Sequence, residues 1–331
     1  MKLDINAKIY VAGHRGLVGS AIWNNLQQRG YKNLVGRTHA ELDLMDAVAV
    51  RRFFDEERPD AVVLAAAHVG GIMANLHDRA DFIFQNLQIQ QNVIGEAWRH
   101  GVQRLLFLGS TCIYPREAPQ PMTEDSLLTS PLEYTNEPYA IAKIAGLKLC
   151  ESLNLQYGTN YIAVMPTNLY GPNDNFDLVS SHVLPAMIRK FHDAKMAGAD
   201  HVTLWGTGRP MREFLWSEDM ADASVHVLLN VDFHDTYDDA PVNSDGIREI
   251  RNCHINVGTG IEHTIKEVAE KVKATVGFQG DIIWDTSKPD GTPRKLTDVS
   301  KLHRLGWHHS VDLDEGIQRL YQWYLDHGAA R

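Results

Sequence analysis

Ile9-Tyr10-Val11-Ala12-Gly13-His14-Arg15-Gly16-Leu17-Val18-Gly19 is the most informative segment of the chain, and it lies within the first twenty residues. Its four apolar residues predict a buried strand, and the segment Val18–Arg29 predicts a helix. Glycines spaced in this way between a strand and a helix permit a tight turn and close approach of the backbone to a pyrophosphate. The spacing alone is a weak signal, and a glycine turn that binds nothing is the alternative. From its position we predict a dinucleotide-binding loop, with cofactor contacts at Gly13, Arg15, Gly16, Leu17, Val18 and Gly19.

The end of the predicted second strand bears on which dinucleotide is bound. NAD-preferring versions usually carry an acidic residue there, which holds the ribose hydroxyls. Here the sequence is Gly36-Arg37-Thr38-His39, with the first carboxylate at Glu41, and Arg15 projects toward the same region. Two cations and a histidine suit a 2′-phosphate, although Arg37 could instead be a solvated surface residue. We therefore predict NADP(H), and the expected contacts in this region are Arg37, His39, Asp43 and Leu44.

Apolar runs and helical segments alternate through the first half of the chain. Runs that predict buried strands lie at residues 34–35, 61–67, 105–108 and 161–165, and Phe82–His100 is long enough for a crossover helix. Strict alternation of strand and helix is typical of the α/β class, with right-handed crossovers between parallel strands. The expected fold is therefore a Rossmann doubly wound parallel sheet.

After Pro166 the apolar pattern becomes less regular. Segments that predict helices lie at residues 183–197, 218–229, 265–276 and 313–327, and a strand is expected at 202–205. We therefore expect two domains. Residues 1–170 form an NADP-binding Rossmann domain that receives elements from the C-terminal half, and residues 171–331 form a smaller α/β domain, mainly for substrate.

Composition and charge exclude several other classes. The chain of 331 residues is 44% hydrophobic and has a net charge of −10, which argues against a general nucleic-acid or membrane-surface binder. No apolar run approaches the ~20 residues that span a bilayer, and the N-terminus lacks a signal-peptide pattern, so we expect a cytoplasmic protein. Cys112, Cys150 and Cys253 are widely spaced, and we expect neither a disulfide framework nor a metal site.

Two reactive side chains follow the fourth predicted strand. Tyr139-Ala140-Ile141-Ala142-Lys143 places a phenol and an ammonium group one helical turn apart on the same face. A tyrosine ordinarily has a pKa near ~10, and we expect the lysine to lower it so that Tyr139 can exchange a proton with a substrate oxygen. Ser110 stands at the carboxyl end of the strand, where such sheets bind ligands. Tyr-x-x-x-Lys is common on solvated helices, but with Ser110 it predicts the triad of a carbonyl reductase or dehydrogenase.

Together these residues resemble the extended short-chain dehydrogenase/reductase family, over nearly the whole chain. Within it they are most similar to the branch that epimerises C3 and C5 of GDP-4-keto-6-deoxy-D-mannose and reduces C4 with NADPH, giving GDP-L-fucose. The strings that carry the resemblance are Gly-His-Arg-Gly-Leu-Val-Gly (13–19), Val-Gly-Gly-Ile (69–72), Phe-Leu-Gly-Ser-Thr-Cys-Ile-Tyr-Pro (107–115), Asn-Glu-Pro-Tyr-Ala-Ile-Ala-Lys (136–143), Met-Pro-Thr-Asn-Leu-Tyr-Gly-Pro (165–172), Arg-Glu-Phe-Leu (212–215) and Lys-Pro-Asp-Gly-Thr-Pro-Arg-Lys (288–295).

The resemblance implies roles for further residues. Positions matching Cys112 and His182 are the acid–base pair that inverts the carbons beside the C4 ketone, whereas a free cysteine is more often a small buried hydrophobe. Implied cofactor contacts are Leu108, Gly109, Ser110, Lys143, Pro166, Asn168, Leu169 and His182. Implied contacts with the GDP-sugar substrate are Lys190, Trp205 and Arg212, and weaker candidates are Lys288 and Arg294.

Several alternatives are open. A related branch forms GDP-L-colitose from a 3-deoxy sugar, in which only C5 inverts. A sugar-nucleotide dehydratase typically has Thr-Asp-Glu at the positions where this chain has Ser110-Thr111-Cys112. A simple 4-epimerase needs no Cys112. A non-catalytic dinucleotide sensor needs none of the reactive side chains. The resemblance also implies a homodimer with a four-helix interface, which we assign to the helices that begin near Phe82 and Tyr139.

Overall fold

The computed structural model describes residues 3–178, 181–237, 242–288 and 290–327, so short parts of both predicted domains lie outside the described residues. Its largest sheet has six parallel strands in the order β2-β1-β3-β4-β5-β9. These strands are β1 (Ile9–Ala12), β2 (Leu34–Val35), β3 (Ala61–Leu64), β4 (Arg104–Leu108), β5 (Asn160–Pro166) and β9 (Ile255–Val257). The predicted Rossmann-type parallel sheet is confirmed.

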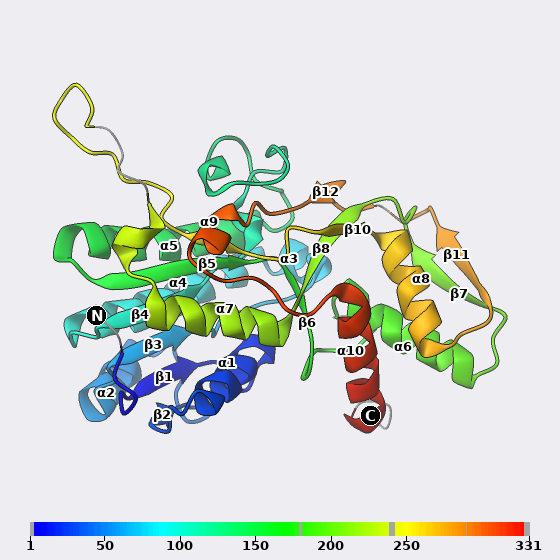
Figure 1. Ribbon diagram of the computed structural model, residues 1–331, viewed down its shortest axis with the longest axis horizontal. Helices are drawn as coiled ribbons and strands as arrows, with labels where there is room; N and C mark the ends of the chain where they lie inside the picture. The colour runs from blue at the N-terminus through cyan, green and yellow to red at the C-terminus, as the bar shows by residue number, and fades with distance from the viewer. Residues whose placement is uncertain (1–2, 179–180, 238–241, 289, 328–331) are drawn as a thin grey trace.

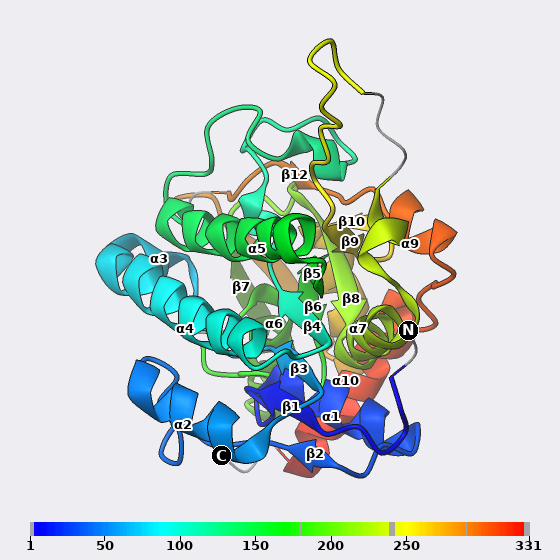
Figure 2. The same cartoon turned by 90° about the vertical axis from the view of Figure 1, so that its left-hand side faces the viewer.

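Helices cover both faces of this sheet, because successive strand residues point into two different cores. Ile9 and Val11 belong to the core that contains α1 (Leu17–Gln28) and α7 (Ser217–Asn230). Tyr10 and Ala12 belong to the opposite core, which contains α2 (Ala47–Glu57), α4 (Arg79–Arg99) and α5 (Glu137–Tyr157). The short helix α3 (Ile72–His77) precedes α4. Figures 1 and 2 show the two helical layers, with α4 and α5 packed side by side.

The predicted strand at 61–67 is too long. β3 ends at Leu64. Beyond it, the amide and the carbonyl of His68 bond to the Asn86 side chain at 3.0 and 2.9 Å, respectively. A buried asparagine from α4 thus takes the place of a neighbouring strand, and the chain leaves the sheet.

A smaller α/β region is built from the C-terminal half. Its central strand β8 (Met211–Trp216) pairs with β6 (Asn168–Tyr170), β10 (Glu262–Thr264) and β12 (Arg294–Lys295), and β7 (His201–Trp205) pairs with β11 (Asp281–Asp285). The helices α6 (Val183–Met196), α8 (Ile265–Val276) and α10 (Leu313–His327) share one apolar core with β6, β7 and β8. The short α9 (Ser300–Arg304) packs near β9.

Two elements of the second half join the first region instead. β9 extends the six-stranded sheet beside β5, and α7 packs against α1. β8 and β9 occupy segments for which the sequence predicts no strand. Arg212 and Glu213 interrupt the apolar pattern of β8, and Glu213 is nevertheless fully buried. A buried charged residue on an interior strand is a pattern that apolar periodicity does not detect.

Candidate active site

The glycine loop connects β1 to α1 at the carboxyl edge of the sheet. The Gly16 amide donates to the Gly13 carbonyl at 3.0 Å, and α1 begins at Leu17. Gly13 has a φ of +83°, and a Cβ on it would lie 2.8 Å from the backbone nitrogen of Ala66. A side chain therefore does not fit at this position. The tight loop at a helix N-terminus fits the pyrophosphate of a dinucleotide.

The three residues predicted near the 2′-phosphate differ in exposure and in whether another side chain already pairs with them. Arg15 is exposed, and no ion pair involves it among the described residues. Arg37 instead donates to the Glu57 carboxylate, and its guanidinium carbon lies 5.6 Å from the centre of the Phe53 ring. His39 is 84% exposed at its side chain. Of the three, Arg15 is therefore the side chain that can meet a ligand without first breaking an ion pair.

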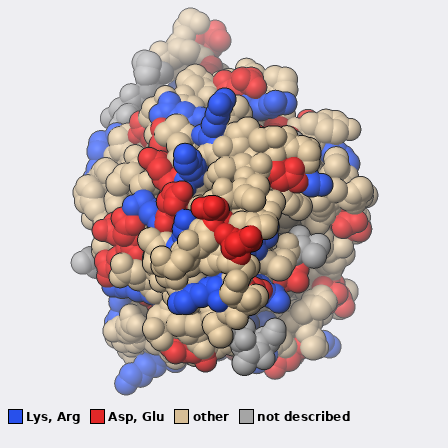
Figure 3. Space-filling model, turned by 90° about the vertical axis from the view of Figure 1, so that its right-hand side faces the viewer, with Lys and Arg blue, Asp and Glu red and all other residues tan. Residues whose placement is uncertain are grey.

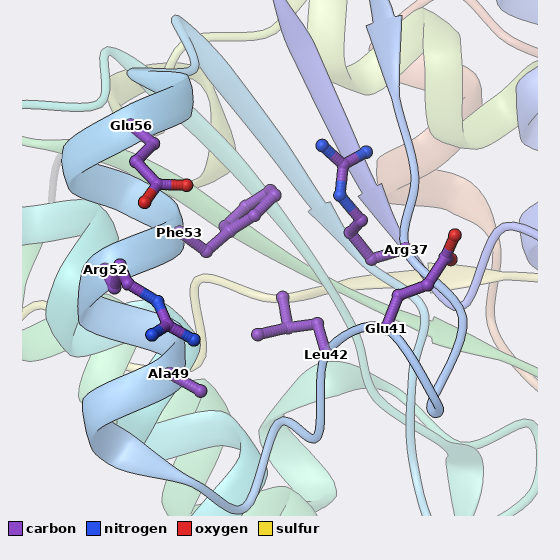
Figure 4. A pocket seen from close by; sticks show the side chains of 7 residues that line it. All are labelled: Arg37, Glu41, Leu42, Ala49, Arg52, Phe53 and Glu56. Atoms are coloured by element: carbon purple, nitrogen blue, oxygen red, sulfur yellow. The ribbon is translucent and has the colours of Figure 1, made fainter.

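Arg37 also lines a small pocket of about 110 Å³ between α2 and the segment that follows β2. Figure 4 shows the side chains that line it, which are Arg37, Glu41, Leu42, Ala49, Arg52, Phe53 and Glu56. Two arginines are balanced by two glutamates, so the lining has no excess of positive charge. Asp43 lies 3.8 Å from His39, and the Leu44 carbonyl accepts from the Asn92 side chain at 2.8 Å.

The predicted catalytic serine follows β4 directly. The Gly109 amide donates to the Val164 carbonyl at 2.8 Å, which keeps this turn next to β5. The side chain of Ser110 caps the 3-10 turn η1 (Thr111–Ile113), because its Oγ accepts from the Cys112 amide at 3.2 Å. Ser110 and Cys112 therefore share one turn at the carboxyl end of β4. Both side chains are partly exposed.

Helix α5 brings Tyr139 and Lys143 to the same turn, since it packs against η1. The Lys143 side chain is buried, and its Nζ donates to the Leu108 carbonyl at 2.8 Å and lies 5.7 Å from the centre of the Tyr139 ring. Desolvation lowers the pKa of Lys143 to about 8. Four of the five predicted catalytic residues are thus gathered around the end of β4.

The expectation that Lys143 lowers the pKa of Tyr139 is wrong. Burial raises the pKa of the Tyr139 phenol well above its ordinary value, and the nearby Cys112 thiol raises it further. The reason is that desolvation opposes the charged phenolate, while the Lys143 ammonium group is directed at the Leu108 carbonyl. A phenol that retains its proton is suited to donate that proton to a substrate oxygen.

His182 lies directly before α6. Its carbonyl accepts from the Ala186 amide at 3.1 Å, and the residue as a whole is exposed, although protein atoms surround much of the imidazole. Desolvation by the surrounding protein lowers the pKa of the imidazole below its ordinary value. In the part of the chain that the structure describes, no hydrogen bond or ion pair links this ring to the other four residues. The partnership of His182 with Cys112 stays a prediction.

The other predicted cofactor contacts lie where the two sheets approach each other. Pro166 is the last residue of β5, opposite Val257 of β9. Asn168 and Leu169 belong to β6, which pairs with β8. The Asn168 side chain donates to the Glu213 carbonyl at 2.8 Å. These contacts connect the carboxyl edge of the parallel sheet to the central strand of the smaller region.

An exposed tryptophan marks the predicted nucleotide-sugar contacts. Trp205, which is 65% exposed, ends β7. The Lys190 and Lys288 ammonium groups lie 5.7 and 5.6 Å from the centre of its ring. Desolvation lowers the pKa values of Lys190 and of Arg212. An aromatic surface beside desolvated cations suits a nucleobase and its diphosphate.

This end of the molecule carries charges of both signs. Figure 3 shows acidic and basic side chains interspersed over that face, with no single-sign patch in the view. Arg294 donates to both carboxylate oxygens of Glu262 at 2.8 Å, so this weaker candidate is already paired. Asp290 accepts from the Thr207 amide at 2.8 Å and fixes the loop beside Trp205.

Sequence reasoning missed one charged neighbour of the site. The Nζ of Lys295 lies 3.7 Å from the Cys112 sulfur, although the two residues are 183 positions apart. Lys295 is the final residue of the string 288–295, and the spacing of that string does not indicate a contact with Cys112. The described residues contain no group of three or more His, Cys, Asp or Glu side chains arranged for a metal ion, and none of the described helices is long and apolar enough to cross a membrane.

Comparisons with known proteins identify the family of the chain. The chain is 56% identical to GDP-L-fucose synthase 1 of Arabidopsis thaliana, over 97% of this chain and 94% of the relative, and 54% identical to the GDP-L-fucose synthase of Escherichia coli, over 96% and 97%. A GDP-L-colitose synthase of Yersinia pseudotuberculosis is 36% identical, over 96% and 98%. A solved GDP-mannoheptose C4 reductase of Campylobacter jejuni with NADP bound has a TM-score of 0.87 and 44% identity, covering 98% and 99%. Because the model of the NAD dependent epimerase/dehydratase family also matches residues 9–242, the chain belongs to that family.

Proposed function

We propose that this enzyme converts GDP-4-keto-6-deoxy-D-mannose to GDP-L-fucose, by inverting C3 and C5 of the sugar and reducing C4 with NADPH. The GDP-L-fucose synthases of Arabidopsis thaliana and Escherichia coli support this activity, since they are 56% and 54% identical to the chain over nearly its whole length. The structural observation that carries the proposal is the shared turn of Ser110 and Cys112 beside Tyr139. It combines a carbonyl-reduction triad with a thiol that a simple reductase does not need.

NADP(H) is the cofactor in this proposal. When bound, NADPH supplies the hydride that reduces C4. The Gly13 cradle receives the pyrophosphate, and Arg15 meets the 2′-phosphate. Lys143 would hold the nicotinamide ribose, and Pro166, Asn168 and Leu169 would contact the nicotinamide end. The Campylobacter jejuni relative, which was solved with NADP bound, supports this choice of cofactor.

The epimerisations use the acidity of the carbons that flank the C4 ketone. Cys112 removes a proton from carbon, which leaves an enolate whose oxygen is stabilised by hydrogen bonds from Ser110 and Tyr139. His182 takes part in the same proton transfer and returns a proton to the opposite face of the carbon. The Cys112 thiol then releases its proton to solvent and His182 regains one, and repetition at the second carbon inverts both centres.

The reduction takes place at C4, whose oxygen also carries the charge of the enolate. Once C4 becomes tetrahedral, its alkoxide takes the proton of the Tyr139 phenol, which the raised pKa keeps in place until that moment. Lys143 is charged below about pH 8 and supports this transfer with its positive charge. The nucleotide end of the substrate is held by Lys190, Trp205 and Arg212 through stacking and charge.

The alternatives receive less support. The GDP-L-colitose synthase of Yersinia pseudotuberculosis is 36% identical to this chain, compared with 56% and 54% for the GDP-L-fucose synthases of Arabidopsis thaliana and Escherichia coli. A dehydratase that eliminates water needs carboxyl acid–base groups, and this chain has Thr111 and Cys112 at those positions.

We also propose that the enzyme is a cytoplasmic homodimer that pairs through α4 and α5. Both helices carry large exposed apolar side chains, including Phe84 on α4 and Leu155 on α5, which are 60% and 50% exposed. Figure 2 shows these helices together on one side of the molecule. Sedimentation of the wild type and of Phe84→Glu tests this surface, because the charged variant should sediment as a monomer.

The direct test of the activity is to incubate the purified enzyme with GDP-4-keto-6-deoxy-D-mannose and NADPH and to identify the product by NMR. The proposal predicts GDP-L-fucose. A C4-reduced product with the original configuration at C3 and C5 would instead identify a reductase without epimerase activity. A clear preference for the 3-deoxy substrate would identify the colitose-type enzyme.

A further inference from the structure

We propose that Lys295 activates Cys112, because its ammonium group stabilises the thiolate that takes the proton from carbon. This inference rests on the proposed function, in which Cys112 is an acid–base group. Because Lys295 acts through the sulfur of Cys112, it is a positioning residue of the epimerisation half of the reaction.

The contact between the two side chains carries the inference. The Lys295 Nζ lies 3.7 Å from the Cys112 Sγ, and both residues are partly buried. A cation close to a cysteine favours the thiolate, which is the form that acts as a base or nucleophile. Among the described residues, no carboxylate forms an ion pair with Lys295. The positive charge is therefore available to the sulfur.

The backbone of Lys295 is fixed from the side of β8. β12 pairs with β8 in parallel, with Lys295 opposite Arg212. Two residues further on, the amide and the hydroxyl of Thr297 donate to the Glu213 carboxylate at 3.0 and 2.7 Å. Glu213 is fully buried and also accepts from the Gly260 amide at 2.7 Å. This buried carboxylate ties the segment that carries Lys295 to the centre of the sheet.

The same segment is fixed on its other side by the loop that follows η1. The Leu296 amide donates to the Gln120 side chain at 2.7 Å, and the Met122 amide donates to the Leu296 carbonyl at 2.8 Å. Residues 120–122 belong to the loop that follows the turn of Cys112, so hydrogen bonds connect the segment of Lys295 to the loop that continues from Cys112. The backbone segments that carry the two side chains are thus held together by the fold.

Successive side chains of β12 point to opposite sides of the strand, which separates Lys295 from Arg294. Arg294 points to the opposite side of the strand and binds the Glu262 carboxylate at 2.8 Å. The two consecutive cations therefore serve different partners. Arg294 is a matched control, since its substitution removes a positive charge from the same strand without removing the charge beside the sulfur.

The test compares the alkylation rate of Cys112 by iodoacetamide at pH 7.5, followed by mass spectrometry, in the wild type, Lys295→Met, Lys295→Arg and Arg294→Gln. Cys150 and Cys253 are buried, so Cys112 is the accessible thiol. We expect Lys295→Met to slow alkylation by about tenfold, because alkylation follows the thiolate fraction. Lys295→Arg should restore most of the rate, and Arg294→Gln should match the wild type. Lys295→Gln serves as a second variant if Lys295→Met folds poorly.

A second readout separates this inference from the proposed function. With substrate in D₂O and no NADPH, deuterium exchange at C3 and C5 should slow in Lys295→Met to the same degree as alkylation. Alkylation at the wild-type rate in Lys295→Met would overturn the role of Lys295 and leave the proposed function of Cys112 untouched. Slowed alkylation with unchanged exchange would remove Cys112 from the epimerisation, and the role of Lys295 with it.

Discussion

The cofactor loop and the reaction face are built in different ways. The loop occupies seven consecutive residues, 13–19, and works mainly through its backbone: a glycine at positive φ, a close approach to Ala66 and a helix N-terminus. The reaction face, made of Ser110, Cys112, Tyr139, Lys143 and Lys295, gathers side chains from the turn after β4, from α5 and from β12, and its contacts join residues up to 183 positions apart. Changes to the loop should therefore alter cofactor binding, and changes to the face should alter individual proton transfers.

The two regions also treat charge differently. Arg15 at the loop is exposed and hydrated, whereas Lys143 is buried and has its pKa lowered to about 8. The Tyr139 phenol has its pKa raised for the same reason, because burial disfavours each charged form. In the proposed function, cofactor selection thus uses an accessible charge, while the chemistry uses groups whose proton affinity is set by desolvation.

The largest expected effect separates chemistry from cofactor binding. Tyr139→Phe keeps the volume of the ring and removes the proton donor, so the rate of C4 reduction should fall by ~10²–10⁴-fold. NADPH binding, measured by fluorescence titration, should persist because the glycine loop and Lys143 are unchanged. Tyr134→Phe is a matched control, since Tyr134 is 66% exposed and lies five residues earlier. Reduction near the wild-type rate in Tyr139→Phe would remove this residue from the chemistry.

The same contrast explains which features could be predicted from sequence. The strands and the loop of the first region follow from local apolar runs and glycine spacing, and β1, β2 and α10 match their predicted bounds. β8 was missed because Arg212 and Glu213 interrupt its apolar pattern, although hydrogen bonds satisfy the buried carboxylate. The direction of the Tyr139 pKa shift depends on burial, which the spacing of Tyr139 and Lys143 does not contain.

Contacts among the side chains of the reaction face were harder to predict from the sequence. The family resemblance singled out Cys112, but nothing in the spacing indicates that Lys295 contacts it, since that contact depends on how β12 pairs with β8. At Arg37, by contrast, the sequence predicts a ligand contact and the structure shows a protein partner. Its position after β2 suggests a phosphate contact, and only the structure reveals its ion pair with Glu57.

A smaller effect is expected from the exposed charge of the loop. Arg15→Ala should raise the KM for NADPH between about tenfold and a hundredfold, because it removes a charged hydrogen bond to the 2′-phosphate. The KM for NADH should change little. Arg37→Ala should have a weaker effect, since Glu57 already engages that guanidinium group. Matched kinetics with both cofactors check this, and equal or better use of NADH by the wild type would contradict the assignment of NADPH.

The smallest effect concerns pH. Lys143 is charged below its pKa of about 8 and neutral above it, so the reductive kcat/KM should decline as pH rises through 8. By pH 9 it should reach roughly a tenth of its value at pH 7. Lys143→Arg, which stays charged, should be slower overall and should lack this decline. A wild-type profile that is flat from pH 7 to 9 would mean that the Lys143 charge is not required.

The most direct measurement of the division between carbon proton transfer and hydride transfer is deuterium exchange without NADPH. In D₂O, the wild type should introduce deuterium at C3 and C5 of GDP-4-keto-6-deoxy-D-mannose, as followed by NMR and mass spectrometry. Cys112→Ala should exchange both positions far more slowly, and with NADPH it should still reduce the un-inverted ketone slowly. Undiminished exchange at both carbons in Cys112→Ala would contradict the account and leave Cys112 as a packing residue.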